Sequence, residues 1–194
     1  RALDIIERNM KLQAQIIEDL LDVSSIVTGK LRIELRLVDV APVVAAAVDV
    51  VLPSAQARRI RLESSLEVPA GPGGAAAGPV MADPDRLQQI VWNLLSNAVK
   101  FTPEGGWIKI WLEVSDGHFL IHVSDSGHGI AAEFLPHVFE RFRQAEHALT
   151  RAHRGLGLGL AIVRHLTELH GGTVVVRSGG PDRGAVFTVS LPMA

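Results

Sequence analysis

Residues 85–103 read DRLQQIVWNLLSNAVKFTP, and this stretch decides how the rest of the chain is interpreted. Its apolar residues recur at the spacing of a single helix face, which predicts a helix with one buried side. That apolar face consists of Leu87, Ile90, Val91, Leu94, Leu95 and Ala98. On the adjoining face Gln89, Asn93 and Asn97 follow at intervals of four residues, with Lys100 further along. Side chains at these spacings line up along one side of a helix, so we expect a row of amides that ends in a lysine.

This polar row has two interpretations. A solvated helix face usually mixes glutamate with lysine, whereas this one carries neutral amides beside an apolar face. Amide oxygens can share a hard cation, and the ammonium of Lys100 can hold a phosphate. Alternatively, a half-buried helix could use its asparagines to bond neighbouring loops. The helix alone favours neither interpretation, so the rest of the chain has to decide.

The composition favours one ordinary domain with an appended segment and excludes several functional classes. A chain of 194 residues can bury a sizeable core, and a net charge of -2 with interspersed signs argues against nucleic-acid binding. The absence of cysteine excludes disulfides and cysteine-based zinc sites. The longest apolar run, 40–52, contains Asp49 and is shorter than the ~20 residues that span a bilayer, so we expect no membrane contact. No signal peptide is visible, and because the chain opens on Arg1 we interpret it as part of a longer protein.

Residues 2–27 are expected to form a long helix that ends at Gly29. Its apolar positions are Ile5, Leu12, Ile16, Leu20, Val23 and Val27, with Ile6, Ile17 and Leu21 widening the face. A helix with so wide an apolar face needs partner helices, as in a bundle. We therefore divide the chain into a pairing segment, 1–29, and a main domain, 30–194.

The main domain is predicted to be a two-layer α+β sandwich, because its strands are joined mostly by hairpins and its helices gather on one face. It is not a doubly wound nucleotide-binding fold. Asp39 is expected to cap the second helix and Pro84 to lie in the first turn of the third. The expected strands are 30–38, 60–68, 107–114, 118–125, 173–178 and 185–191, and the expected helices are 40–57, the 85–103 stretch and 159–170.

Asp125 ends the strand 118–125 on the same face as the residues expected in the core. A carboxylate that points inward needs donors or a ligand that supplies them. The sequence that follows, SGHGI, places Gly127 and Gly129 where the backbone can approach a flat ligand closely, and the carboxylate can accept from an exocyclic amine such as that of adenine. An ordinary Asp-Gly turn is the alternative explanation for this motif.

A second glycine motif, Arg154-Gly-Leu-Gly-Leu-Gly-Leu160, precedes the helix 159–170. Backbone amides at a helix N-terminus can cradle phosphate, although neither a P-loop nor a Rossmann context is present. The intervening segment 134–153 contains Phe139 and Phe142 and is rich in arginine, and we interpret it as a mobile lid. A solvated charged loop with a short amphipathic helix is the alternative.

In their order along the chain, the motifs Asn-x3-Asn-x2-Lys, Asp-x-Gly-x-Gly, Phe-x2-Phe and Gly-x-Gly-x-Gly resemble the N, G1, F and G2 boxes of the sensor histidine kinases. The resemblance extends over the whole chain. Residues 6–26 are similar to the second helix of the dimerisation and phosphotransfer hairpin, and 134–145 to the lid of hybrid-type kinases. The resemblance implies a Bergerat-type ATP-binding domain with a mixed sheet backed by three helices.

By this resemblance, Asn97 ligates Mg²⁺ with Asn93 in support, Lys100 neutralises phosphate, and Asp125 accepts from the adenine amine. The other nucleotide contacts that the family implies are Gly127, Gly129 and Ile130 around the base, Gly155, Leu156, Gly157, Gly159 and Leu160 along the triphosphate, and Phe139, Phe142 and Arg143 in the lid. ATP and Mg²⁺ are the implied cofactors.

Asn93 also bears on the reaction, because the gyrase and chaperone ATPases of the same superfamily carry a glutamate there as general base. An amide cannot take a proton from water, so transfer to a partner is expected rather than hydrolysis. The chain departs from the family at Ser126, at Arg154, and at Gly184-Ala-Val-Phe187, which lacks a hydroxyl often found near the adenine.

The resemblance also implies partners: the phosphoacceptor helix of the same kinase, a response-regulator receiver domain and a second copy in a homodimer. All eight histidines lie from His118 to His170, outside the helical segment, and we expect them to be structural. The fragment is therefore expected to bind nucleotide in the cytoplasm without phosphorylating itself. A nucleotide-binding scaffold without catalysis and a hydrolysing ATPase are the alternative functions.

Overall fold

The computed structural model describes residues 31–67, 78–144 and 156–194, together with 20–26 and the single residues Met10, Gln13, Ile17 and Thr28. Its main sheet has five strands in the order β2-β4-β5-β7-β6. β2 runs parallel to β4, and the other neighbours are antiparallel. The strand bounds are Arg61–Ser65 for β2, Trp107–Ser115 for β4, His118–Asp125 for β5, Thr173–Arg177 for β6 and Ala185–Pro192 for β7.

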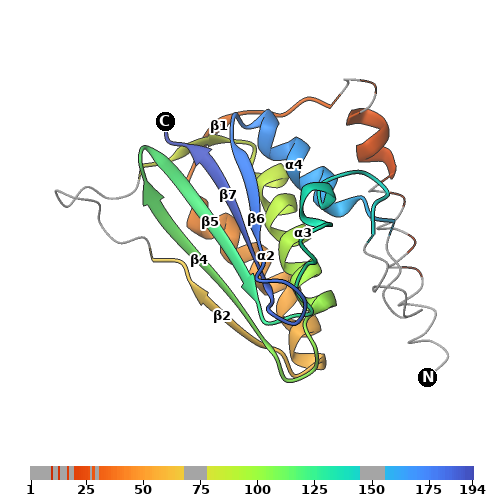
Figure 1. Cartoon of the computed structure of the whole chain (residues 1–194). Coiled ribbons are helices and arrows are strands. Elements are labelled where there is room, and N and C mark those ends of the chain that lie inside the picture. Colours follow the sequence, from red (N-terminus) through yellow and green to blue (C-terminus); the bar gives the residue numbers. More distant parts are fainter. Residues whose placement is uncertain are drawn as a thin grey trace.

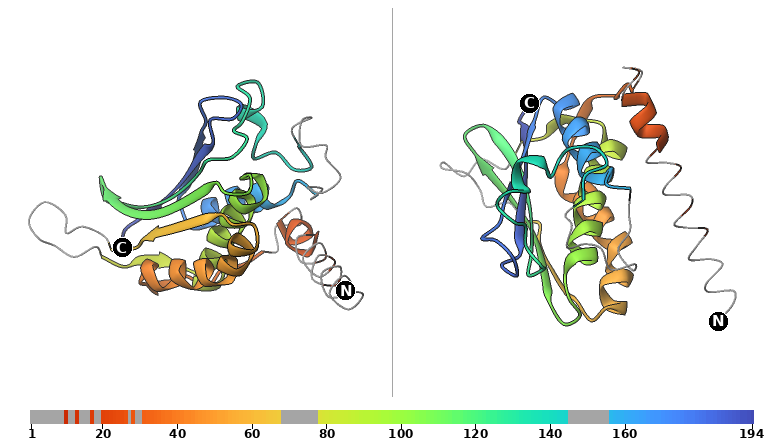
Figure 2. Two further views of the ribbon diagram at one scale, coloured as in Figure 1. Left: turned by 90° about the horizontal axis from the view of Figure 1, so that it is seen from below. Right: turned by 45° about the vertical axis from the view of Figure 1, so that its right-hand side comes forward.

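Three helices cover one face of this sheet, and Figure 2 shows the sheet and the helices as two layers. The helices are α2, Val40–Ala57, α3, Pro84–Phe101, and α4, Gly159–Leu169, with a short 3-10 helix η1, Leu135–His137, on the connection after β5 (Figure 1). The apolar face of α3 predicted from the sequence is fully buried against the inner side of the sheet. The predicted α+β sandwich with a mixed sheet and three helices is therefore confirmed.

Two predicted strands are shorter than expected, and one strand was missed. The alternating segment 30–38 forms a strand only at β1, Arg36–Val38, which pairs with the unpredicted β3, Val80–Ala82. β3 stops there because Asp83 begins the next helix, so the residues of 31–35 have no ladder partner. Only Arg61–Ser65 of the segment 60–68 is a strand, and Val68 lies outside the described residues.

The beginning of α3 is held by Asp83. Its carboxylate accepts from the backbone N–H groups of Asp85 at 3.1 Å and Arg86 at 3.2 Å, as expected for an N-cap. It also accepts from the N–H of Glu34 at 3.0 Å, which ties the segment before β1 to the helix. Burial raises the pKa of Asp83, but the three backbone donors outweigh it and hold the pKa below its ordinary value.

The end of α3 is held by Arg58, which the sequence did not single out. Its guanidinium donates to the carbonyl oxygens of Val99, of Lys100 at 3.2 Å and of Thr102 at 3.0 Å. The last carbonyls of a helix have no partner within the helix, and a cation there also interacts favourably with the helix dipole. A residue at the end of α2 therefore fixes the turn that carries Lys100.

We expect Arg58→Ala to lower the free energy of unfolding by about 2 kcal/mol, because hydrogen bonds from a charged donor are lost and the carbonyls are left without it. Urea denaturation measures this change. Arg61→Ala is the matched control, since the Arg61 side chain is 72% exposed and, among the residues that the structure describes, forms an ion pair with Glu63 alone, so a change below about 0.5 kcal/mol is expected. Equal losses in the two variants would contradict the capping role of Arg58.

The helical segment 20–26 packs onto the domain. Val23 and Ile26 are buried and belong to the same hydrophobic cluster as the core of the sandwich. The end of the appended helix is thus part of the domain's packing, while most of the predicted helix 2–27 and its end at Gly29 lie outside the described residues. The division into 1–29 and 30–194 stays a prediction.

Among the described helices, α2 is long and apolar enough to cross a bilayer by length and composition. Core helices pass the same test. Val44, Ala47, Val51 and Ala55 of α2 are buried in the hydrophobic cluster shared with α3. We therefore assign α2 to the core of the sandwich.

Candidate functional site

The amide row of α3 lies directly under the start of α4. Asn93 is buried, its Nδ2 donates to the carbonyl of Gln89 at 3.1 Å, and its Oδ1 accepts no hydrogen bond from the described residues. A Cβ atom added to Gly159 would lie 2.9 Å from Asn93 Oδ1 and 3.8 Å from Asn97 Nδ2. Because a side chain at Gly159 would crowd the amides, glycine lets the backbone approach them closely. The structure therefore brings the amide row and the second glycine motif, 62 to 66 residues apart in the sequence, into one place.

Lys100 is half-buried in the last turn of α3. Burial lowers its pKa from the ordinary value, and its Nζ lies 4.8 Å from the centre of the Phe101 ring. No ion pair of Lys100 is found among the described residues, so its charge has no carboxylate partner there. An ammonium in such a place can accept a phosphate as its counter-ion.

Asp125 ends β5 with its carboxylate buried, as the alternation of the strand predicted. Its Oδ1 accepts from the N–H of Gly127 at 2.8 Å. Burial raises the pKa of Asp125 above its ordinary value, and the backbone donors of Gly127 and Ala185 offset part of that effect. The carboxylate of Asp125 is therefore a buried hydrogen-bond acceptor, to which the exocyclic amine of a flat base can donate.

The loop after Asp125 is locked to two neighbours by close backbone contacts. A Cβ added to Gly127 would lie 2.6 Å from the carbonyl oxygen of Phe101, at the end of α3. Gly129 has a φ of +66°, and a Cβ there would lie 2.0 Å from the carbonyl oxygen of Gly180. The first glycine motif therefore packs against both α3 and the β6–β7 turn, which sets where Ile130 lies.

Ser178 is a residue of this region that sequence reasoning missed. Its hydroxyl donates to the carbonyl of Gly184 at 2.6 Å and accepts from the N–H of Ile130 at 2.9 Å. The N–H of Gly184 in turn donates to the carbonyl of Gly127 at 3.0 Å. The only sequence feature that could have pointed to Ser178 is its position at the end of the predicted strand 173–178, just before a Gly-rich turn. Ser178 thus joins the turn between β6 and β7 to the loop that follows Asp125.

The two phenylalanines of the predicted lid differ in their surroundings. Phe139 is partly buried and meets Phe187 of β7 edge-on, with ring centres 6.3 Å apart. The side chain of Phe142 is 64% exposed at a φ of +60°, and its N–H donates to the carbonyl of Gly157 at 3.0 Å. A Cβ at Gly157 would lie 2.7 Å from the carbonyl oxygen of Arg143, so backbone, not side chain, joins the lid to the glycine motif.

Part of the predicted site lies outside the described residues. Gly155, and the basic residues Arg151 and Arg154, lie outside the described residues. Leu156 is 36% exposed, and Leu160 lies partly buried in the first turn of α4. The region that the structure describes thus contains the later part of the second glycine motif but not its start.

The donor set on α3 fits Mg²⁺ in kind. Asn93 and Asn97 offer amide oxygens, which are hard ligands, but two neutral amides leave most of an octahedral shell to phosphate oxygens and water. No group of three or more His, Cys, Asp or Glu side chains suited to a metal occurs among the described residues. A metal here would therefore be held jointly by the protein and a bound polyphosphate.

His122 and His170 lie where the sequence predicted, on the outer face of a strand and at the end of a helix, and both make contacts within the fold. His122 lies on the outer face of the sheet, where its ring stacks on Trp111 with centres 4.6 Å apart. At the end of α4, His170 is buried, its Nε2 accepts from the N–H of Asp83 at 3.0 Å, and its Nδ1 lies 2.7 Å from the carbonyl oxygen of Leu166. These two contacts together require a neutral ring that carries its proton on Nδ1.

Comparison with known proteins agrees with this geometry. Residues 82–194 match the family model HATPase_c, described as histidine kinase-, DNA gyrase B-, and HSP90-like ATPase. The chain is 36% identical over 215 residues to hybrid signal transduction histidine kinase D of Dictyostelium discoideum, covering 98% of the chain and 14% of the relative. It is 35% identical over 180 residues to circadian input-output histidine kinase CikA of Synechococcus elongatus, covering 92% of the chain and 23% of the relative.

Solved structures of histidine kinases are also similar to this chain. Full-length ShkA in complex with AMPPNP superposes with a TM-score of 0.77 at 30% identity, covering 93% of this chain and 35% of that one. The catalytic domain of histidine kinase ThkA superposes with a TM-score of 0.67 at 24% identity, covering 83% and 97%, which supports the fold alone. The chain spans less than a quarter of the length of the two curated relatives above.

Proposed function

The chain belongs to the family of histidine kinase-, DNA gyrase B- and HSP90-like ATPases, and from this membership we propose that it binds Mg-ATP and transfers the γ-phosphoryl group to a histidine on an adjacent helical hairpin. This is the reaction of two-component signal transduction, in which the phosphoryl group passes on to a receiver domain. The proposed partners are the phosphoacceptor helix, the receiver domain of a response regulator and a second copy of the kinase. The proposed location of this part is the cytoplasm.

The observation that carries the proposal is the placement of Gly159 against Asn93 and Asn97. Asn97 would ligate Mg²⁺ with Asn93 in support, and the amides at the start of α4 would hold the phosphates. Lys100 would neutralise phosphate charge at the end of the row. Held by Asn97 and Asn93, Mg²⁺ would supply positive charge against the phosphate charge that develops during transfer.

The base would lie against the first glycine motif. Asp125 would accept from the adenine amine, and Gly127, Gly129 and Ile130 would form the wall beside it. Ala185 pairs with Asp125 across β5 and β7 and carries no hydroxyl, so it contributes no side-chain contact to a water near the base. The remaining proposed contacts are Phe139, Phe142 and Arg143 in the lid, and Gly155, Leu156, Gly157 and Leu160 along the triphosphate.

Transfer is favoured over hydrolysis by the side chain at position 93. The Asn93 amide already donates to the Gln89 carbonyl, and an amide oxygen is too weak a base to activate water. Gln89, Asn93 and Asn97 supply no carboxylate along this face of α3. Catalysis would then consist of positioning and charge neutralisation.

Incubation with γ-labelled ATP tests this function. We expect Mg²⁺-dependent binding, no stable label on the chain by itself, and label on an acceptor helix added as a separate polypeptide. Stable label on the chain alone would contradict the structural role given to its histidines. Steady phosphate release without acceptor would identify a hydrolysing ATPase, and absence of nucleotide binding would identify a scaffold.

A further inference from the structure

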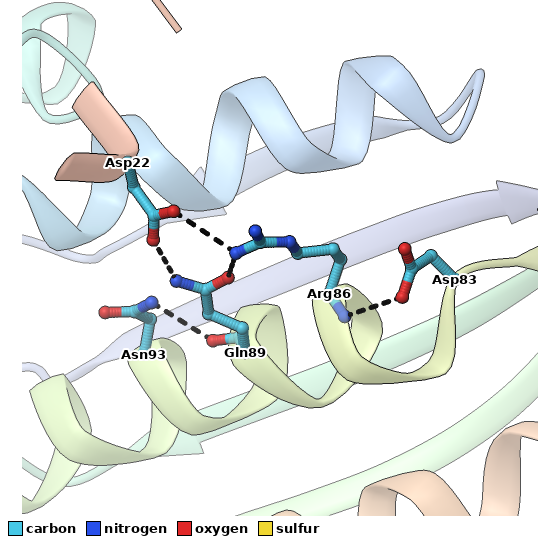
Figure 3. Close-up of polar contacts among 5 residues, drawn as sticks. All are labelled: Asp22, Asp83, Arg86, Gln89 and Asn93. Carbon is cyan, nitrogen blue, oxygen red and sulfur yellow. Dashed lines mark hydrogen bonds and ion pairs between the residues drawn. The ribbon is translucent and has the colours of Figure 1, made fainter. Parts of the chain in front are cut away.

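Asp22, in the helical segment 20–26, makes a closed set of polar contacts with two residues of α3 (Figure 3). Its Oδ1 accepts from Arg86 Nη1 at 3.2 Å, and its Oδ2 accepts from Gln89 Nε2 at 2.5 Å. Arg86 Nη1 also donates to Gln89 Oε1 at 2.8 Å. Each of the three side chains therefore contacts the other two, and we refer to Asp22, Arg86 and Gln89 as the latch.

The latch lies where water has limited access. The side chain of Asp22 is 14% exposed and that of Arg86 is 31% exposed, whereas the surface pair Arg164–Glu168 of α4 is more than half exposed on both sides. Next to Asp22, the apolar Val23 and Ile26 are buried in the core cluster. Charged hydrogen bonds in such a setting are strong and directional, so they define one orientation of the segment on α3.

The latch and the proposed phosphate site occupy the same helix. Gln89 is the residue whose carbonyl accepts from Asn93 Nδ2, and its side chain binds Asp22. Asn93 and Asn97 follow Gln89 by one and two turns of the continuous helix α3, so no hinge separates the residue that binds Asp22 from the proposed metal ligands. Contacts of Asp22 therefore fix the segment 20–26 on the same helix that carries the proposed phosphate site.

We propose that Asp22 is a positioning residue for phosphoryl transfer: through Arg86 and Gln89 it holds the appended helix in the orientation in which the γ-phosphoryl group of ATP on α3 reaches the acceptor. This inference rests on the proposed function. It assigns no chemical step to Asp22, which touches neither the nucleotide site nor the reacting atoms. Phosphoryl transfer depends steeply on alignment, and a displacement of about 1 Å can cost about 100-fold in rate.

The test compares Asp22→Ala, Arg86→Ala and the double variant with the unmodified chain. Transfer from labelled ATP to a separately added acceptor helix is timed, and the dissociation constant for Mg-ATP is measured by calorimetry. We expect each single variant to slow transfer at saturating ATP by about tenfold or more, with the dissociation constant changed less than about twofold. Because both replacements break the same contact, the double variant should be no slower than about the worse single one.

Asp85→Ala is the matched control, since it makes the same charge change one residue from Arg86 and should leave the transfer rate unchanged. Failure of the unmodified chain to bind Mg-ATP would overturn the proposed function. Normal binding with an unchanged or faster transfer rate in Asp22→Ala would overturn the positioning role alone. Additive losses in the double variant would likewise show that Asp22 and Arg86 act separately.

Discussion

Asn97→Ala is expected to weaken Mg²⁺-dependent ATP binding by about 100-fold and to remove measurable phosphoryl transfer. The side chain would lose the amide oxygen that we propose as the protein's direct ligand to the metal, and loss of metal-site contacts commonly costs 10- to 100-fold or more. No side-chain hydrogen bond of Asn97 is found among the described residues, so its removal should cost the fold little. Calorimetric titration with ATP, in Mg²⁺ and in a chelator, measures the effect.

Ser96→Ala is the control for this experiment, because it removes a neighbouring polar group that lies on the same helix but outside the amide row. We expect it to bind Mg-ATP as the unmodified chain does. A chelator removes the metal that Asn97 is proposed to ligate, so Asn97→Ala and the unmodified chain should then bind ADP about equally. Unchanged Mg-ATP binding by Asn97→Ala, with the fold intact by circular dichroism, would show that Asn97 is not a metal ligand.

The features predicted well from the sequence are those that depend on local periodicity. The buried face of α3 follows from the spacing of Leu87, Ile90, Leu94 and Ala98, and the predicted first-turn position of Pro84 and the predicted cap of α2 at Asp39 are both observed. The inward direction of Asp125 follows from alternation along one strand. In each case the residues that decide the structure are neighbours in the chain.

The features that were missed depend on partners far along the chain. Arg58 meets the end of α3 more than forty residues away, and Ser178 meets Ile130 across 48 residues. β3 exists because β1 offers it a ladder, and the three residues of β3 carry no periodic signal of their own. Such contacts come from the packing of finished elements, which hydrophobic pattern and spacing do not specify.

In the candidate site, too, the single motifs could be predicted from neighbouring residues, whereas their contacts with one another could not. The amide row and the two glycine motifs could be found singly, and a family resemblance was needed to join them. The structure adds that Gly159 faces Asn93 and that Gly127 packs on the end of α3. The sequence indicates only that Asp22 belongs to the expected pairing helix, because a single carboxylate gives no indication of a partner more than sixty residues later.

Gly184→Ala is expected to lower the free energy of unfolding by about 3 kcal/mol or more and to weaken nucleotide binding. Gly184 has a φ of +64°, and a Cβ there would lie 1.9 Å from the carbonyl oxygen of Asp125. The backbone must shift to admit a methyl group, and the atom in its way belongs to the residue proposed to bind adenine. The hydrogen bonds from Gly184 N–H to the Gly127 carbonyl and from Ser178 to the Gly184 carbonyl would move with it.

Gly105→Ala separates the two causes of this loss. Gly105 has a φ of +80°, but a Cβ there would meet no atom within 4 Å, so the variant isolates the cost of the left-handed backbone, about 1 kcal/mol. Urea denaturation of both variants then gives the cost of the clash at Gly184 as their difference. Because a Cβ added at Gly105 would reach none of the proposed base-binding residues, its variant should bind nucleotide normally where it is folded. Equal destabilisation of the two variants would show that the turn at Gly184 relaxes without moving Asp125. In that case Gly184→Ala would also keep its nucleotide affinity, which would contradict the second part of the prediction.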